Sequence, residues 1–138
     1  MKDIEKTFGN MIDKQKVCYI AGVDEEGFPN VKAMLKPRKR DGLKEIYFST
    51  NTSSKKVDFF RNNPKACVYF CDQRFYKGLM LKGTVEVLEE QKIKDIIWQF
   101  GDTMYYPKGK TDPDYCVLKF TTIKARYYSN FKSEDFDI

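Results

Sequence analysis

Apolar residues recur at helical spacing in two long segments and one short one. In the first, from Lys2 to Gln15, Asp3 is a candidate N-cap and four apolar residues share one face: Ile4, Phe8, Met11 and Ile12. In the second, from Glu89 to Phe100, the apolar face consists of Ile93, Ile96, Ile97 and Phe100. A short helix is predicted after the capping residues at 51–54, with Val57 and Phe60 on one face, and the proline at position 64 ends it.

Short runs rich in apolar, β-branched and aromatic residues predict strands between these helices. Turn residues separate the runs, including a glycine at position 27 and Asp41–Gly42 within the basic turn at 37–42. The predicted strands cover residues 17–23, 29–36, 45–49, 66–71, 79–88, 115–121 and 124–129. The segment 102–114 is predicted to be a polar loop, and the tail at 130–138 is predicted to be frayed.

The strands follow one another mostly as hairpins, without a strand–helix–strand rhythm. This order predicts a mainly β (α+β) fold, an antiparallel β-barrel with about three peripheral helices that cover its openings. A length of 138 residues corresponds to one domain, and the sequence contains no internal repeat, low-complexity tract or linker. We therefore expect a single domain over residues 1–138.

Composition agrees with a folded, β-rich chain. Hydrophobic residues make up 41% and aromatic residues 15% of the sequence, which is inconsistent with disorder. No run of 18 apolar residues occurs, so no membrane span is expected. The charged N-terminal segment lacks the apolar core of a signal peptide, and we expect a cytoplasmic protein. The net charge of +5 fits a phosphate-bearing ligand or weak nucleic-acid binding and does not decide between them.

Four cysteines lie in apolar, strand-like segments: Cys18, Cys67, Cys71 and Cys116. Two of them, Cys67 and Cys71, would be about 13 Å apart along an extended strand, too far for a disulfide. The chain has no histidine and no C-x-x-C pair, so we expect neither a zinc site nor a Ser-His or Cys-His nucleophile. We interpret the cysteines as reduced packing residues. Any chemistry would then depend mainly on a cofactor.

The segment from Tyr47 to Lys56 joins the end of a strand to the start of a helix. A helix N-terminus offers unpaired N–H groups and the positive end of the helix dipole, where anions bind. Hydroxyl donors and cations accompany it here: Ser49, Thr50, Ser53, Ser54, Lys55 and Lys56. Lys32 and Lys36 share one face of the preceding strand and add positive charge. The segment is therefore a candidate phosphate cradle.

Simpler interpretations stay open for each of these features. Ser53 or Ser54 can act only as a helix cap, and the lysines can be solvated. Lys32 and Lys36 can mark the solvent face of their strand. The basic run at 36–40 could touch a nucleic-acid backbone, but no aromatic residue is interleaved with it, and a solvated turn is the favoured interpretation.

Four stretches, taken in order and spacing, carry a resemblance to a known family. They are Pro29–Met34, Ile46–Lys56 with Asn63–Pro64, Leu79–Val87, and Tyr106–Asp114 followed by Val117–Phe120 and Ala125–Tyr128. From about Met11 to Ser129 the chain resembles the pyridoxamine 5'-phosphate oxidase-like, FMN-binding split-barrel family, and within it the general stress protein branch.

The resemblance implies an antiparallel split β-barrel that forms a homodimer, with FMN at the interface between the subunits. By position, the resemblance assigns contacts with the FMN phosphate to Lys32, Ser54, Lys55 and Lys56. It assigns contacts with the flavin to Ser49 and Thr50.

The chain also departs from this family. Gly78 stands where the oxidases carry a glutamine that approaches the flavin, and Tyr128 stands where the stress-protein branch usually has tryptophan. The oxidases grip pyridoxamine phosphate with an arginine and a histidine, and this chain has no histidine. These departures argue against oxidation of pyridoxamine phosphate.

The leading hypothesis is an FMN-binding protein that acts as a flavin-dependent oxidoreductase on an unknown substrate. No catalytic residue is assigned, although Tyr76, Tyr105 and Tyr106 are candidate proton donors. The alternative is a non-catalytic flavin-binding redox or stress-response protein. A barrel without cofactor that binds nucleic acid or a partner is a third hypothesis, and a deazaflavin or heme ligand in the same groove is a further one.

Overall fold

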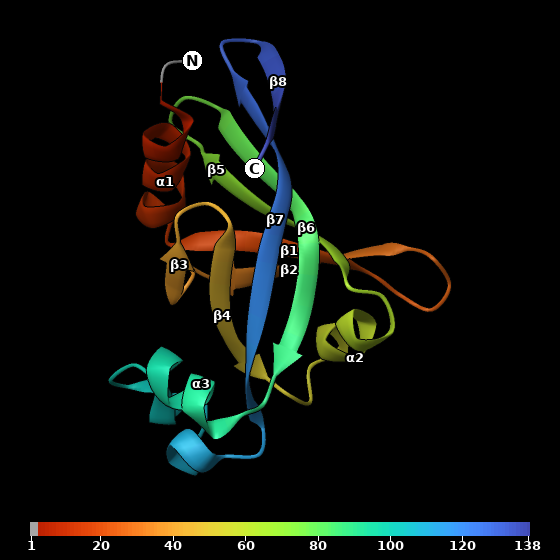
Figure 1. The fold of residues 1–138 in the computed structure, drawn as a ribbon, viewed down its shortest axis with the longest axis vertical. Helices are drawn as coiled ribbons and strands as arrows, with labels where there is room; N and C mark the ends of the chain where they lie inside the picture. The colour runs from red at the N-terminus through yellow and green to blue at the C-terminus, as the bar shows by residue number, and fades with distance from the viewer. Residues whose placement is uncertain (1–2) are drawn as a thin grey trace.

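The computed structural model describes residues 3–138, and in it eight strands form one antiparallel sheet with three α-helices around it (Figure 1). The strands are β1 (Val17–Val23), β2 (Pro29–Leu35), β3 (Lys39–Asp41), β4 (Glu45–Asn51), β5 (Lys65–Asp72), β6 (Lys77–Leu88), β7 (Tyr115–Ser129) and β8 (Lys132–Asp137). The helices are α1 (Ile4–Lys14), α2 (Lys55–Asn62) and α3 (Gln91–Ile97), with short 3-10 turns η1 (Asp102–Met104) and η2 (Gly109–Thr111). The predicted mainly β, antiparallel fold with three peripheral helices is confirmed.

The strand order leaves two separate edges that face each other. Along the sheet the order is β2-β1-β5-β6-β7-β4-β3, and β8 pairs with the second half of β7. In Figure 1, β1 and β2 run across the long β4, β6 and β7. No β2–β4 ladder forms among the described residues. The barrel is therefore open along a seam between β2 and β4, which we call the split.

Alternation of side chains along the strands builds the core inside this curled sheet. Buried residues come from every second position, for example Cys18 and Ile20 on β1 or Leu79 and Leu81 on β6. The helix α1 contributes the buried residues Phe8, Met11 and Ile12. Three of the four residues predicted on its apolar face are thus buried, and the fourth, Ile4, packs against the same core.

The N-terminus of α1 is capped as the sequence predicts. The Asp3 side chain accepts a hydrogen bond from the Lys6 N–H at 3.0 Å, and Glu5 in the first turn complements the helix dipole. The predicted start of the helix at Lys2 lies outside the described residues. The basic turn at 37–42 is more ordered than expected, because residues 39–41 form β3 on the edge of β4 and Arg40 pairs with Asp13 of α1 at 2.8 Å.

The C-terminal part differs from the sequence-based expectation. The two strands predicted at 115–121 and 124–129 are one strand, β7, and the tail predicted to be frayed forms β8. The register with β6 shifts so that Lys82 pairs with Lys124 while Gly83 pairs with Thr122, which leaves Ile123 as an extra residue. Any Cβ at Gly83 would overlap the Thr121 carbonyl oxygen, so glycine permits this close approach. The irregularity at 122–123 is therefore a β-bulge and not a turn.

Helix α3 is shorter than predicted, and only part of its predicted apolar face is buried: Ile97 is buried and Ile93 packs against the same cluster. It ends at Ile97, and both Ile96 and Phe100 of the expected apolar face are exposed. Lys94 is buried instead, because its amino group donates to the Asp112 carbonyl at 3.0 Å and lies 5.1 Å from the centre of the Tyr115 ring. A lysine stem can cover apolar surface when its amine finds a partner, which the helical spacing of apolar residues does not reveal.

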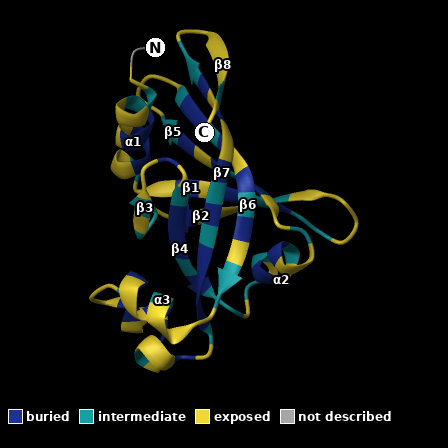
Figure 2. Ribbon diagram, viewed as in Figure 1, coloured by how far each residue is buried: buried dark blue, intermediate teal, exposed yellow. Residues whose placement is uncertain are grey.

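Burial separates the barrel from the segment that contains α3, η1 and η2, which we call the α3 lobe. Figure 2 shows buried positions along the strands, whereas most of the α3 lobe is exposed. All four cysteines are free; Cys18 and Cys116 are buried, and Cys67 and Cys71 are half-buried. In the part of the chain that the structure describes, no helix is both long and apolar enough to cross a membrane.

Candidate functional site

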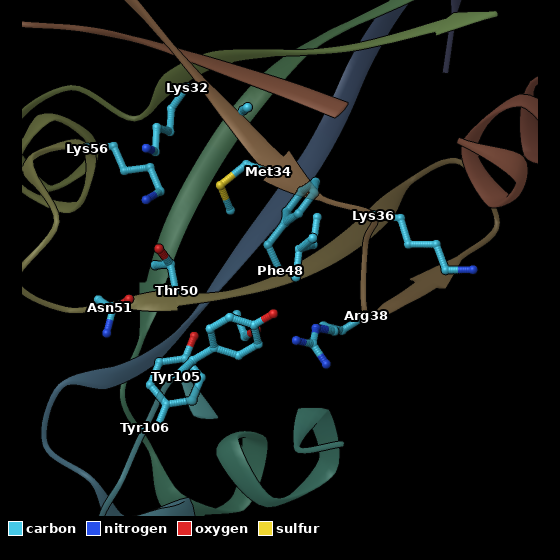
Figure 3. Close-up of a pocket in the computed structure, with 13 residues that line it drawn as sticks. Lys32, Met34, Lys36, Arg38, Phe48, Thr50, Asn51, Lys56, Tyr105 and Tyr106 are labelled. Atoms are coloured by element: carbon cyan, nitrogen blue, oxygen red, sulfur yellow. The ribbon is translucent and has the colours of Figure 1, made fainter. Parts of the chain in front are cut away.

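A pocket of about 360 Å³ lies in the split of the barrel. Residues of β2 form one wall, residues of β4 form the opposite wall, and the loop after η1 closes one side (Figure 3). The lining residues are Lys32, Ala33, Met34, Leu35, Lys36, Arg38, Phe48, Ser49, Thr50, Asn51, Lys56, Tyr105 and Tyr106. Its volume is in the range of small-molecule and cofactor sites.

Two lysines converge at one end of this pocket. Lys32 is opposite Ile20 of β1 and is thus on the core side of β2, the same side as the buried Met34. Lys56 comes from the first turn of α2 and approaches Lys32 in Figure 3. The core-side placement argues against the interpretation of Lys32 as a marker of the outer solvent face of its strand. The split exposes it to the pocket.

The electrostatics of this end favour an anion. Burial, together with the positive charge of Lys32, holds the pKa of Lys56 below its ordinary value of 10.5. Among the described residues, no carboxylate lies within 4.0 Å of either amino group. The Lys56 amine instead donates to the Ser54 hydroxyl at 2.8 Å. Two neighbouring cations without a counter-ion are most stable when an anionic ligand lies between them.

The structure brings together some of the residues predicted for the cradle and separates others. Lys32, Ser49, Thr50 and Lys56 line the pocket. Ser54 is outside the lining, and its hydroxyl accepts a hydrogen bond from the Lys56 amine. Lys55 is exposed on the first turn of α2, and it too is outside the lining.

Other lining residues were not assigned to a cofactor site from the sequence. Met34 and Phe48 supply the apolar part of the walls, one from each side of the split. Asn51 extends the polar end beyond Thr50. Lys36, which the strand periodicity placed on the same face as Lys32, also lines the pocket, but its amino group points away from the other cations in Figure 3. In the sequence, Met34 and Phe48 are marked only by inward positions on their strands. Many core residues share such positions, so this signal could not assign the two residues to a ligand site.

The opposite end of the pocket contains a cation that is fully paired. Arg38 contacts Asp102 at 3.0 Å in an ion pair whose side chains are both nearly buried, and it donates to the Gln99 amide oxygen at 2.8 Å. The Gln99 N–H in turn donates to Asp102 at 2.9 Å. Arg38 therefore fixes the α3 lobe to the segment directly before β3 and is not a free cation for a ligand.

Tyrosines form the floor between the pocket and the α3 lobe. Tyr106 stacks with Tyr115 at a centroid distance of 4.6 Å, and Trp98 packs edge-on against Tyr115 at 5.4 Å. Burial raises the pKa of Tyr106, and the Ser49 hydroxyl offsets part of this increase. Tyr106 therefore stays protonated near neutral pH and can donate a hydrogen bond. Tyr76 is 80% exposed and is not among the residues that line the pocket.

The turn between β4 and α2 is held by Asp114. Its carboxylate accepts from the Ser53 N–H at 2.7 Å and from the Asn51 amide at 2.9 Å, while its carbonyl accepts from the Thr52 N–H at 2.8 Å. These donors, with the Ser53 N–H as the largest contribution, hold the pKa of Asp114 below its usual value. An internal carboxylate thus occupies the Ser53 N–H, which lies just before the N-cap Ser54 of α2.

The two departures noted at Gly78 and Tyr128 are direct neighbours in the structure. Gly78 pairs with Tyr128 across β6 and β7. A Cβ at Gly78 would collide with the hydroxyl of Tyr69, whose ring lies over this glycine from β5. A glutamine cannot replace Gly78 unless Tyr69 moves, so this chain cannot present the side chain that the oxidases carry there.

Comparison with known proteins gives matches over most of the chain. The family model for pyridoxamine 5'-phosphate oxidase matches residues 4–129. A Clostridium acetobutylicum structure, a protein related to general stress protein 26 of Bacillus subtilis, is 38% identical, with a TM-score of 0.90 over 98% of this chain and 94% of that one. A Nostoc punctiforme structure, a pyridoxamine 5'-phosphate oxidase-related, FMN-binding protein, is 11% identical, with a TM-score of 0.77 over 100% of this chain and 97% of that one.

One curated relative adds sequence similarity over a shorter region. The pyridoxine/pyridoxamine 5'-phosphate oxidase of Blochmanniella pennsylvanica is 31% identical over 86 residues, which is 62% of this chain. The match covers only 38% of that oxidase. Most of the oxidase therefore has no counterpart in the aligned region.

Proposed function

The chain belongs to the pyridoxamine 5'-phosphate oxidase family, and we propose that it binds FMN in the split of its barrel and acts as a flavin-dependent oxidoreductase. One observation carries the proposal: Lys32 and Lys56 meet at the end of the pocket without a carboxylate partner among the described residues. Such a pair suits a phosphate, which two ammonium groups can neutralise.

The remaining lining residues fit the other parts of FMN. Thr50 and Asn51 supply polar groups beside the two lysines, Met34 and Phe48 supply apolar surface, and Tyr106 supplies a neutral hydroxyl. Ser54 would act through Lys56, because its hydroxyl accepts a hydrogen bond from the Lys56 amine. Lys55 would contribute only through its charge at longer range. When bound, FMN supplies the redox chemistry, and the protein supplies position and electrostatics.

We further propose that the protein forms a homodimer through the outer face of β1, β2 and β5. Tyr19 is opposite Tyr69 on β5, and Val17 is opposite Leu35 on β2, so these side chains share one face. All four, together with Val31, are at least 38% exposed although large and apolar. A contiguous apolar surface of this kind favours association. Size-exclusion chromatography with light scattering tests the assembly, and a Tyr69→Glu variant should shift it to a monomer.

Parallel titrations with FMN and riboflavin test the cofactor proposal. The two ligands share the ring system and differ in the phosphate, so FMN should bind at least about 100-fold more tightly, because two charge-assisted contacts are lost with riboflavin. Isothermal titration calorimetry of the full-length protein measures both affinities. A protein that binds neither ligand, or both equally, would contradict the proposed site.

Turnover separates an oxidoreductase from a flavin carrier or sensor. The FMN-loaded protein should be reduced by NADH or NADPH faster than free FMN at the same concentration, as followed by loss of the flavin absorbance band without oxygen. A loaded protein that shows no acceleration with either donor would favour the non-catalytic alternative while leaving the cofactor proposal intact.

A further inference from the structure

The turn between β4 and α2 carries an arrangement that the family resemblance does not assign. Residues 51–53 connect the polar end of the pocket to the helix that supplies Lys56. Three hydrogen bonds attach this turn to a single residue of the distant loop before β7, and that residue is Asp114. Asp114 itself is not among the residues that line the pocket.

Asp114 is fixed in turn by its own neighbours. Its N–H donates to one carboxylate oxygen of the buried Asp112 at 2.9 Å, and the other oxygen of Asp112 accepts from the Lys108 N–H at 3.0 Å. The Asp112 carbonyl accepts from the buried Lys94 amine. The β4–α2 turn is therefore bonded, through two aspartates, to the α3 lobe.

The negative charge of Asp114 is unexpected beside a site that would have to attract the anionic phosphate of FMN. The carboxylate has no cation within 4.0 Å among the described residues and is held by neutral donors. It adds a negative charge close to a site for a phosphate, which by Coulomb's law opposes binding. Because the charge opposes phosphate binding while the carboxylate makes two hydrogen bonds to the turn, the arrangement points to a geometric role.

On the basis of the proposed FMN site, we propose that Asp114 is a positioning residue for the phosphate end of the pocket. It holds Asn51 and the turn so that Thr50 and Lys56 keep their places. As an internal anion it also occupies the Ser53 N–H, which directs the ligand's phosphate to Lys32 and Lys56 and away from the turn. Asp114 does not touch the ligand and acts only through the residues that it holds.

The proposal and simple electrostatics predict opposite changes in FMN affinity for one substitution. In Asp114→Asn a negative charge is lost, so Coulomb's law alone predicts tighter FMN binding. The carboxamide, however, can accept from only one of the two donors well, and its NH₂ group would face the other donor. We expect FMN affinity to fall about tenfold, as for loss of one hydrogen bond to a charged group.

Riboflavin distinguishes positioning from general damage to the structure. If Asp114 acts at the phosphate end, Asp114→Asn should leave riboflavin affinity within about twofold of the natural protein, so the FMN-to-riboflavin ratio falls. A loss of general stability would weaken both ligands together. The matched control is Asp58→Asn, which removes the same charge from an exposed position in the first turn of α2 without any hydrogen bond to the β4–α2 turn.

A second variant covers the case in which Asp114→Asn does not fold. Asp114→Glu keeps the charge but moves the oxygens by one methylene, and it should also lower the FMN-to-riboflavin ratio. Calorimetric titration of the full chain at neutral pH measures every affinity. An unchanged or raised ratio in the folded variants would overturn the role of Asp114 alone. Absence of FMN binding by the natural protein would overturn the cofactor proposal instead.

Discussion

The two ends of the pocket each present a cation, but they are built in opposite ways. Arg38 at one end is clamped by Asp102 and Gln99, with Asp102 only 2% exposed. Lys56 at the other end has no carboxylate within 4.0 Å among the described residues, and the positive charge of Lys32 adds to burial in lowering its pKa. At the first end the cation is neutralised by residues of the same chain, whereas at the second end the positive charge is left for a ligand.

The difference shows how to distinguish a scaffold cation from a ligand-binding cation. Removal of one partner of a buried ion pair such as Arg38–Asp102 strongly destabilises the protein, because the other charge stays buried without a partner. Two like charges without a counter-ion lower the stability of the folded protein, and a ligand that binds between them gains that energy. Removal of each cation should therefore change different quantities: protein stability at one end and ligand affinity at the other.

The largest effect is expected at the scaffold end. Arg38→Met should lower the free energy of unfolding by about 3–5 kcal/mol, because Asp102 stays buried without its partner. Urea denaturation followed by circular dichroism measures the change. Arg61→Met is the matched control, because the Arg61–Glu89 pair at 2.9 Å is exposed and should contribute less than about 1 kcal/mol. Equal losses in both variants would contradict the role of Arg38 as a scaffold cation in a buried pair.

The next largest effect is expected in cofactor affinity at the other end. Lys56→Ala should weaken FMN binding about 10- to 100-fold, since one hydrogen bond to a charged group is lost. Lys55→Ala removes the same charge one residue earlier, from an exposed side chain, and should change affinity less than about threefold. The double variant should resemble Lys56→Ala. If calorimetry gives the same loss for both single variants, the phosphate is not held in the pocket.

An alkaline loss of affinity should follow from the lowered pKa of Lys56. The free protein loses the Lys56 proton at a pH below 10.5, and a bound phosphate favours the protonated form. FMN affinity should therefore fall as the pH rises through the pKa of Lys56 in the free protein. Lys56→Arg keeps its charge throughout this range, so it should lose this decrease. Because flavin titration affects both proteins alike, the difference between their profiles isolates Lys56.

The smallest expected effect is a gain of stability without ligand. The folded state lowers the pKa of Lys56, so the protonated lysine destabilises the free protein below that pKa, and the penalty disappears as the pH rises from that pKa to the ordinary value of 10.5. Lys56→Met should therefore raise the free energy of unfolding at pH 7 by up to about 1 kcal/mol. The difference should vanish at alkaline pH. A loss of more than about 1 kcal/mol at pH 7 would indicate that Lys56 stabilises the fold itself.

Much of the fold was readable because its signals are local. The N-cap at Asp3, the inward faces of α1 and the strands, and the proline that ends α2 depend on neighbours within a few residues. The sequence-based predictions were wrong where contacts between segments distant in sequence determine the structure. Lys94 is buried because it forms hydrogen bonds with Asp112 and Tyr115, which are distant in sequence. Strand β7 continues across Ile123 because Gly83 on β6 allows a β-bulge there.

The candidate site divides in the same way. Residue types alone singled out the hydroxyl- and lysine-rich junction as a candidate anion site, whereas the pairing of that junction with Lys32 came from the family resemblance. Only the tertiary structure showed that Lys32 lies on the core side of an open seam and that Lys55 is not among the residues that line the pocket. It also showed that the Ser54 hydroxyl bonds to Lys56 and that the Asp114 carboxylate bonds to the β4–α2 turn. The reason is physical: a side chain's chemistry is fixed by its own atoms, but its partners are set by how strands far apart in sequence curl together.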